Sequence, residues 1–168
     1  MLTAIAALLK RDLATLEREI AAYPDDASLW TAVPGQRTSG GNLALHLVGN
    51  LRHFIGAGLG NTRYLRDRPQ EFGRRGLSRA ELIEGVRDTA REVETTLAAF
   101  DRTRLTEPFP LAVAGIHPIT STFLIHLCTH LTFHLGQLDY HRRAATGNPA
   151  SVGPLPLDFM AQQAPPWL

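Results

Sequence analysis

Two stretches of this sequence are nearly free of charged residues, and each is long enough to form a helix. Between positions 42 and 59 the only charged residue is Arg52, and between positions 118 and 140 it is Asp139. Charged side chains normally occupy the exposed faces of helices in globular proteins. Both stretches are therefore expected to be covered nearly all round, by other helices, by the C-terminal tail or by a second subunit.

Two further helices are predicted from apolar residues that recur every three or four positions, and these helices carry many charges. The first covers residues 3–22 and the second runs from Ser78 to about Phe100. Ser78 and Glu81 form a capping box, in which each side chain satisfies a free backbone N–H at the start of the helix. The expected core stripes contain Ala6, Leu9, Leu13, Leu16 and Ile20, and Leu82, Val86, Val93 and Leu97.

The charge-poor helices are expected at about 40–58 and from near Pro118 to about 145, where Gly147 ends the pattern. Four helices without a convincing strand predict an all-α four-helix bundle.

The connection 59–77 shows no clear periodicity. Its nineteen residues could extend to roughly 60 Å, whereas an eighteen-residue helix is only about 27 Å long. A crossover that makes the second and third helices parallel is therefore possible.

The chain has 168 residues, which suits one domain, with the bundle in residues 1–147. The tail 148–168 is rich in proline and is expected to pack on the bundle or to be partly disordered.

A net charge of +1 gives no argument for a nucleic-acid or membrane partner. No stretch is long and apolar enough to span a membrane and no signal core precedes the first helix, so the expected compartment is the cytoplasm.

Each charge-poor helix carries a stripe of polar residues in which histidine dominates. At 100° per residue, the polar residues of the second helix fall within about 80° of arc; they are Asn42, His46, Asn50 and His53. The stripe of the last helix contains His126, His130, His134, Gln137 and His141. Buried polar groups need partners, and two facing rows of imidazoles can find one in a metal ion. The alternative is that these are the uncharged polar faces of two amphipathic helices.

A metal site would use His130 and His134, because residues four apart lie one helical turn apart on the same side. The third ligand would come from the other stripe, from His46 or His53. Three neutral ligands leave coordination positions open, as in catalytic sites. No glutamate follows His130, so the pair lacks the general base of a zinc metalloprotease. The single cysteine, Cys128, lies about 160° from His130 on the helix and is expected to be a small buried hydrophobe.

A cluster of arginines occupies the long connection and the start of the next helix, interrupted by Asp67 and Glu71. It is either a solvated loop or a rim that attracts anions to a nearby site. Its members are Arg63, Arg66, Arg68, Arg74, Arg75 and Arg79.

Three segments resemble the DinB-like, YfiT-like superfamily of metalloenzymes. The run from His130 to Gln137, His-x-x-x-His-x-Gly-Gln, is similar to the signature of that family's fourth helix, and residues 45–52 are similar to the signature of its second. Residues 66–72 resemble the segment that follows the second helix in one branch. The likeness extends over about residues 1–147.

The resemblance implies an up-down-down-up bundle with the long crossover between the second and third helices. It also implies that His46, His130 and His134 bind the metal, usually zinc or nickel, and that the protein is a homodimer. A pairing surface would then explain the uncharged outer sides of the charge-poor helices. His53 and His126 are expected to support the ligands or line the pocket, and Asn50 and Gln137 to orient a ligand or water. His117 and His141 are expected at the surface or at helix ends.

The expected function is metal-dependent and acts on a small molecule, although the residues do not decide whether the protein is an enzyme. The resemblance favours transfer reactions that use a low-molecular-weight thiol, which a metal would bind as the thiolate. Hydrolysis by a metal-bound water is an alternative, weakened by the lack of an acidic residue in the helix motifs. The remaining alternative is a non-catalytic protein that the ion stabilises.

Overall fold

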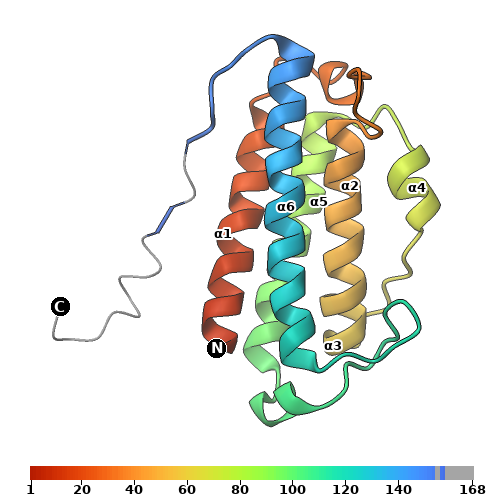
Figure 1. The fold of residues 1–168 in the computed structure, drawn as a ribbon, viewed down its shortest axis with the longest axis vertical. Helices are drawn as coiled ribbons and strands as arrows, with labels where there is room; N and C mark the ends of the chain where they lie inside the picture. Colours follow the sequence, from red (N-terminus) through yellow and green to blue (C-terminus); the bar gives the residue numbers. More distant parts are fainter. Residues whose placement is uncertain (154–155, 158–168) are drawn as a thin grey trace, which may run out of the picture.

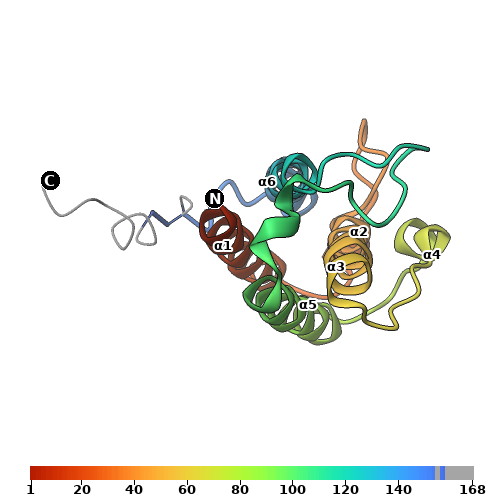
Figure 2. The same ribbon diagram turned by 90° about the horizontal axis from the view of Figure 1, so that it is seen from below.

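The structure is a computed structural model that describes residues 1–153 and 156–157. This part of the chain is mostly helical and forms no strand, which confirms the all-α prediction. Four long helices lie side by side, and the end-on view of Figure 2 shows them around a common core. They are α1 (Leu2–Ala21), α2 (Gly40–Leu51), α5 (Arg79–Ala99) and α6 (Thr120–Thr146), with short helical segments η1 (Ser28–Trp30), α4 (Arg68–Gly73) and η3 (Arg102–Thr106) between them.

The connections place the ends of these helices in two groups. In Figure 1 the N-terminus and the start of α6 lie at the lower end of the molecule. The α1–α2 connection, the start of α5 and the end of α6 lie at the upper end. The chain returns from the lower end of α2 to the start of α5 along the outside of α2, and α4 lies on this return path.

The core is built from the apolar stripes predicted for the charged helices. Leu9, Leu16 and Ile20 on α1 are fully buried, and Leu82 and Val86 on α5 are nearly so. Each fully buried side chain of this kind contributes roughly 1.5–3 kcal/mol to stability through removal from water. Most of the charged residues between them lie toward solvent, so the amphipathic pattern determines which faces meet. Asp12 and Glu19 on α1 are buried instead and form ion pairs with Arg11 and Arg142.

The helix ends follow local sequence signals, with one difference. The capping box is present: Ser78 accepts from the backbone N–H of Glu81, and the Glu81 carboxylate accepts from that of Ser78. Gly147 ends α6 in the left-handed conformation, at φ 67°. The start of α6 is Thr120, two residues after Pro118. The carbonyl of Pro118 instead accepts a hydrogen bond from Phe109 in the preceding turn, so this proline is outside the helix.

The sequence predicts a regular second helix over about residues 40–58, but the observed helix is regular only to Leu51. After α2 the backbone forms a π-helical segment, η2 (Arg52–Ala57), and one final turn, α3 (Gly58–Gly60). A Cβ at Gly56 would lie 1.7 Å from Glu92 Oε1, so the absence of a side chain lets α5 approach here. A π turn takes one residue more than an α turn, which changes the faces of the residues that follow.

The long connection contains a helix, α4, that the sequence pattern did not indicate. Asp67 caps it by accepting from the backbone N–H of Gln70 at 3.1 Å. Asn42 on α2 donates to the backbone carbonyls of Glu71 and Arg74, at 2.9 and 3.1 Å. These bonds hold α4 against the outer side of α2, so the chain itself covers that charge-poor helix.

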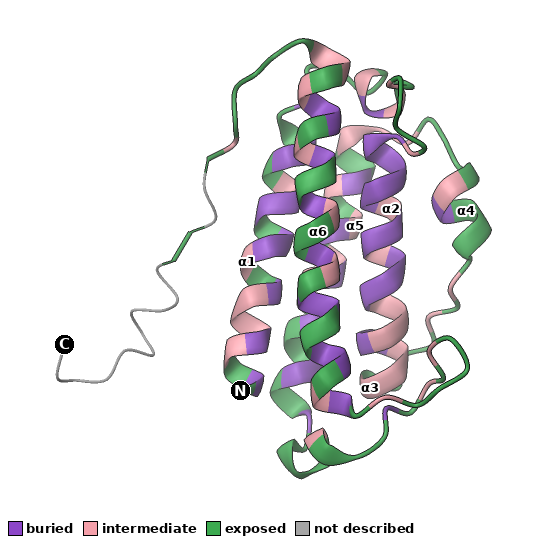
Figure 3. Ribbon diagram, in the orientation of Figure 1, coloured by how far each residue is buried: buried purple, intermediate pink, exposed green. Residues whose placement is uncertain are grey.

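The outer side of α6 is different, because the described part of a single chain leaves it open. Ile125, Phe133 and Tyr140 are exposed on it by 49%, 63% and 69%, and Figure 3 shows a green face along much of α6. The other helices therefore do not cover this side of α6, and its cover by the C-terminal tail or a second subunit stays a prediction.

The start of the predicted tail follows the end of α6 and contacts α1 and α6. Arg142 donates to the carbonyl of Ala150 at 2.9 Å, and Arg18 donates to that of Val152 at 3.3 Å. Residues 154–155 and 158–168 lie outside the described residues, so the prediction for the tail as a whole remains a prediction. No helix among the described residues is both long and apolar enough to cross a membrane.

Candidate metal centre

The side chains of His46, His130 and His134 meet between α2 and α6. One ring nitrogen from each lies within 4.8 Å of the other two. His46 Nε2 and His130 Nε2 are 3.3 Å apart. Two nitrogens bound to one tetrahedral ion at 2.0–2.1 Å lie roughly 3.3 Å apart, so this spacing can accommodate a metal ion.

His46 is oriented by a carboxylate from the crossover connection. Its Nδ1 donates to Glu71 Oε2 at 2.9 Å, and both side chains are buried. A proton on Nδ1 leaves the lone pair on Nε2, the nitrogen that faces His130. Carboxylates commonly hold metal-binding histidines in this way, which fixes the tautomer and makes the ligand more basic.

Glu71 is itself held in the charged form. Arg66 donates to it twice, from Nε at 2.6 Å and from Nη2 at 2.9 Å. Burial raises the pKa of Glu71, but the hydrogen bonds from His46 and Arg66 outweigh it and lower the pKa below its ordinary value. The buried carboxylate therefore stays ionised at neutral pH, with both its oxygens satisfied.

The sequence pattern does not single out Glu71 as a site residue, because there it is only a charge that interrupts the arginine cluster. One physical requirement pointed to such a residue: a metal-bound imidazole needs an acceptor for its second N–H. The second helix offers no acidic residue. The acceptor therefore had to come from another segment, and the adjoining connection carries Asp67 and Glu71.

The two histidines of α6 differ in their partners. His134 Nδ1 bonds to Gln137 Oε1 at 2.6 Å, which directs its Nε2 toward the other rings. His130 Nδ1 is buried and has no hydrogen-bond partner among the described residues. Burial, followed by the neighbouring His134, His46 and His126, lowers the pKa of His130 to about 4. His130 is therefore neutral at pH 7, as a metal ligand must be.

An open cavity of about 350 Å³ adjoins the three histidines. Asn50 and His126 line it, as expected, and His126 stacks on Phe123 with ring centroids 5.7 Å apart. His53 is not part of the lining, contrary to expectation. Phe54, the next residue of the π-helical segment, lines the cavity instead. The remaining lining residues are Arg66, Arg68, Phe72, Val113 and Leu127.

The arginine cluster divides between the site and the surface. Arg66 and Arg68 line the cavity. Arg75 instead lies over the ring of Trp30, and Arg79 pairs with Asp26 near the end of α1. Only part of the cluster therefore lies at the site, and Arg66 is paired there with Glu71.

Three other residues singled out in the sequence lie outside the cluster. Cys128 is buried with Sγ 3.9 Å from the carbonyl of Ile5, and burial raises its pKa to about 11, as suits a small core residue. His117 is exposed, as expected. His141 is fully buried, which corrects its placement at the surface. Its ring nitrogens bond to the hydroxyl of Tyr23 and the carbonyl of Thr31. His141, the last histidine of the stripe, is therefore part of the core and not of the site.

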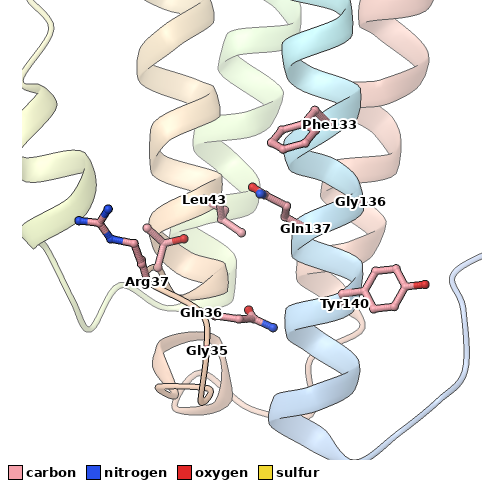
Figure 4. Close-up of a pocket in the computed structure, with 9 residues that line it drawn as sticks. Gly35, Gln36, Arg37, Leu43, Phe133, Gly136, Gln137 and Tyr140 are labelled. Atoms are coloured by element: carbon pink, nitrogen blue, oxygen red, sulfur yellow. The ribbon is translucent and has the colours of Figure 1, made fainter.

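A second, larger hollow of about 600 Å³ lies further along α6 (Figure 4). The connection before α2 lines one side, with Gln36 and Arg37, and α6 lines the other, with Phe133 and Tyr140. Gln137 also lines this hollow and bonds to His134, so the hollow borders the histidine cluster, although none of the three histidines lines it. A Cβ at Gly136 would meet nothing within 4 Å, so this glycine borders the hollow and does not mediate close helix packing.

A sequence profile described as the DinB superfamily matches residues 8–138. The match spans most of α1 through most of α6 and includes the three clustered histidines and Glu71. Neither the curated proteins nor the solved structures gave a match.

Proposed function

Because the chain belongs to the DinB superfamily, we propose that it is a metal-dependent enzyme in which His46, His130 and His134 bind one divalent ion. The observation that carries this proposal is the convergence of one ring nitrogen from each of three histidines on a common point. Three imidazoles suit zinc or nickel, which favour nitrogen ligands. The bonds to Glu71 and Gln137 support it, because they leave the nitrogens that face each other free of protons.

The arrangement favours catalysis over a purely structural role. Structural zinc sites are closed by four protein ligands, whereas this cluster has three members among the described residues and adjoins an open cavity. An ion bound here would supply Lewis acidity at a position open to a substrate. The protein's own contribution is to hold the three rings, keep Glu71 ionised and line the open side with Phe54, Phe72 and Phe123.

We favour a transfer reaction in which the sulfur of a small thiol attacks an electrophilic substrate. Metal coordination would keep the thiol ionised at neutral pH. No Asp or Glu lies among the described residues that line the cavity, and Glu71 is occupied by His46 and Arg66. Hydrolysis by an activated water would need a base, so it has less support than an incoming nucleophile that is already charged.

The finer description of the fold and the assembly also belongs to this proposal. The grouping of helix ends in Figure 1 supports an up-down-down-up bundle whose crossover carries α4. The exposed apolar side chains of α6 support a homodimer formed through that face. The substrate is then a small molecule that enters from the cavity beside the histidines.

The test begins with metal analysis of the purified protein loaded with zinc, nickel or cobalt. The wild type should hold one ion per chain and His130→Ala much less, while His117→Ala, an exposed histidine outside the cluster, should match the wild type. A stoichiometric ion in His130→Ala would reject the site. The cobalt form should then change its absorption spectrum when a small thiol is added. Thiol with an aryl halide should give the thioether, with release of halide and of the thiol proton. No spectral change and no product would reject thiol transfer, and turnover of simple esters at pH 7 to 9 would favour hydrolysis instead.

A further inference from the structure

Besides His130 Nδ1, two polar groups at the cavity beside the histidines have no hydrogen-bond or ion-pair partner among the described residues, and together they define a class of ligand. We infer that it binds a small aromatic anion that also carries a hydrogen-bond donor, with the anionic group at Arg68 and the donor at Asn50. The inference rests on the proposed function, because it names the substrate class of that same site.

Asn50 supplies the first observation. It lies on α2, one turn after His46, and the residue is 94% buried. Its Oδ1 is buried and has no hydrogen-bond partner among the described residues, although the residue lines the cavity. A buried polar atom without a partner is costly and uncommon in native proteins. A ligand with an O–H or N–H group directed at Asn50 would remove that cost.

Arg68 supplies the second, independent observation. It lines the same cavity from α4, and its guanidinium lies over the ring of Phe72, 5.3 Å from the centroid. It forms no ion pair in the described part of the chain, whereas the neighbouring Arg66 is neutralised by Glu71. A guanidinium held on an aromatic face and free of a carboxylate is suited to bind a carboxylate, sulfonate or phosphate group.

The walls determine the body of the ligand. Phe54, Phe72 and Phe123 line the cavity, and no acidic residue does so within the described chain. A volume of about 350 Å³ lies at the lower end of the range for small-molecule sites. The cavity therefore favours a compact aromatic molecule and disfavours cations.

The experiment uses aromatic sulfonates, since a sulfonate is a weak metal ligand and binding then reports on the protein. Calorimetry on the zinc-loaded protein at pH 7 compares 3- and 4-hydroxyphenylmethanesulfonate with phenylmethanesulfonate, which lacks the donor, and with benzyl methyl sulfone, which lacks the charge. At least one hydroxylated sulfonate should bind about tenfold more tightly than phenylmethanesulfonate, because a site with an unpaired acceptor discriminates strongly. The neutral sulfone should bind more weakly than either anion. Equal affinities would overturn the inference.

Two variants assign the two contacts. Asn50→Leu, which replaces the unpaired amide by an apolar group of similar size, should abolish the preference for the hydroxyl while retaining affinity for phenylmethanesulfonate. Arg68→Gln should weaken all the sulfonates about tenfold and leave the sulfone unchanged. Arg75→Gln is the matched control, because Arg75 lies over Trp30 and not in the cavity. A hydroxyl preference that survives in Asn50→Leu, or an anion preference that survives in Arg68→Gln, would overturn the assignment.

Metal analysis of the same samples separates this inference from the proposed function. If the wild type holds zinc at one ion per chain but does not distinguish the probes, the ligand class is wrong and the metal site stands. If the probes are distinguished but no ion is retained, the ligand class stands and the metal-dependent function fails.

Discussion

The carboxylate of Glu71 accepts a hydrogen bond from His46 Nδ1 at 2.9 Å, although the two residues are twenty-five positions apart in the sequence. The bond joins the short helix of the crossover to the second long helix. It places a buried negative charge behind one of the three clustered histidines, on the side away from the other two. The crossover is therefore part of the candidate site as well as a connection.

Glu71→Gln should lower the affinity for zinc by about 10- to 100-fold, as is typical when the group behind a metal-bound histidine is changed. The amide can still accept from His46, but it carries no charge and leaves Arg66 without a counter-ion. Competition with a chromophoric chelator measures the affinity. Glu84→Gln, an exposed acid on α5, should behave as the wild type. Equal affinity in Glu71→Gln would show that the carboxylate does not support the ion.

Gly49→Ala should also weaken metal binding, although Gly49 contacts none of the ligands directly. A Cβ at this position would lie 2.1 Å from Glu71 Oε1, so the carboxylate must move away from His46. Gly85→Ala is the matched control, because a Cβ there meets nothing within 4 Å on a helix. That control should raise the free energy of unfolding by roughly 0.5–1 kcal/mol. Unchanged zinc affinity in Gly49→Ala would contradict the role of this close approach.

Regular helical spacing was sufficient to place His46, His130 and His134 on facing stripes, because such stripes depend only on local geometry. It failed for His53, which lies in the π-helical segment that includes Gly56, where Glu92 of another helix approaches closely. Contacts between distant segments of this kind leave little trace in the local pattern.

Glu71 and His141 show the same limit at two further positions. Glu71 reaches the site through the path of the crossover, which α4 and the bonds from Asn42 determine. His141 is core because Tyr23 and Thr31 from the first connection supply its partners. Neither partner set could be deduced from the spacing of residues along one helix.

The metal-free protein should become less stable as the pH falls from about 6.5 toward 4. The pKa of His130 is about 4 in the folded protein because of burial, against an ordinary value of 6.5. Between these values the unfolded chain binds a proton that the folded one does not, so the free energy of unfolding falls with pH. At 1.36 kcal/mol per pKa unit the loss is at most about 3 kcal/mol, and partial exposure of the ring reduces it.

Urea denaturation of chelator-treated protein at pH 7 and pH 5 measures this loss. Burial also lowers the pKa of His134 and His141, so their contributions have the same sign. His130→Gln should therefore show a smaller difference between the two pH values than the wild type. An equal difference in both proteins would mean that His130 titrates normally in the fold.

Cys128→Ser should leave the metal content unchanged, although Cys128 is only two residues from His130. Its sulfur points toward Ile5 of α1, on the opposite side of α6 from the cluster. Burial raises its pKa to about 11, so it is also expected to react slowly with thiol reagents at pH 7. Metal analysis and the rate of modification by a disulfide reagent test both statements. Loss of the ion in Cys128→Ser would contradict the geometry of α6.

Ile125→Glu should weaken self-association without loss of the metal ion. Ile125, Phe133 and Tyr140 lie at eight- and seven-residue spacing, so they form one exposed apolar stripe on α6. Burying this stripe against a second copy would remove apolar surface from water, and a charge within it opposes that burial. Ile125 does not line the cavity of the site.

Leu65→Glu is the matched control, because Leu65 is 90% exposed in the crossover, away from α6. Sedimentation equilibrium should give a dimer for the wild type and the control and a monomer for Ile125→Glu; an unchanged dimer in Ile125→Glu would place the interface on another face.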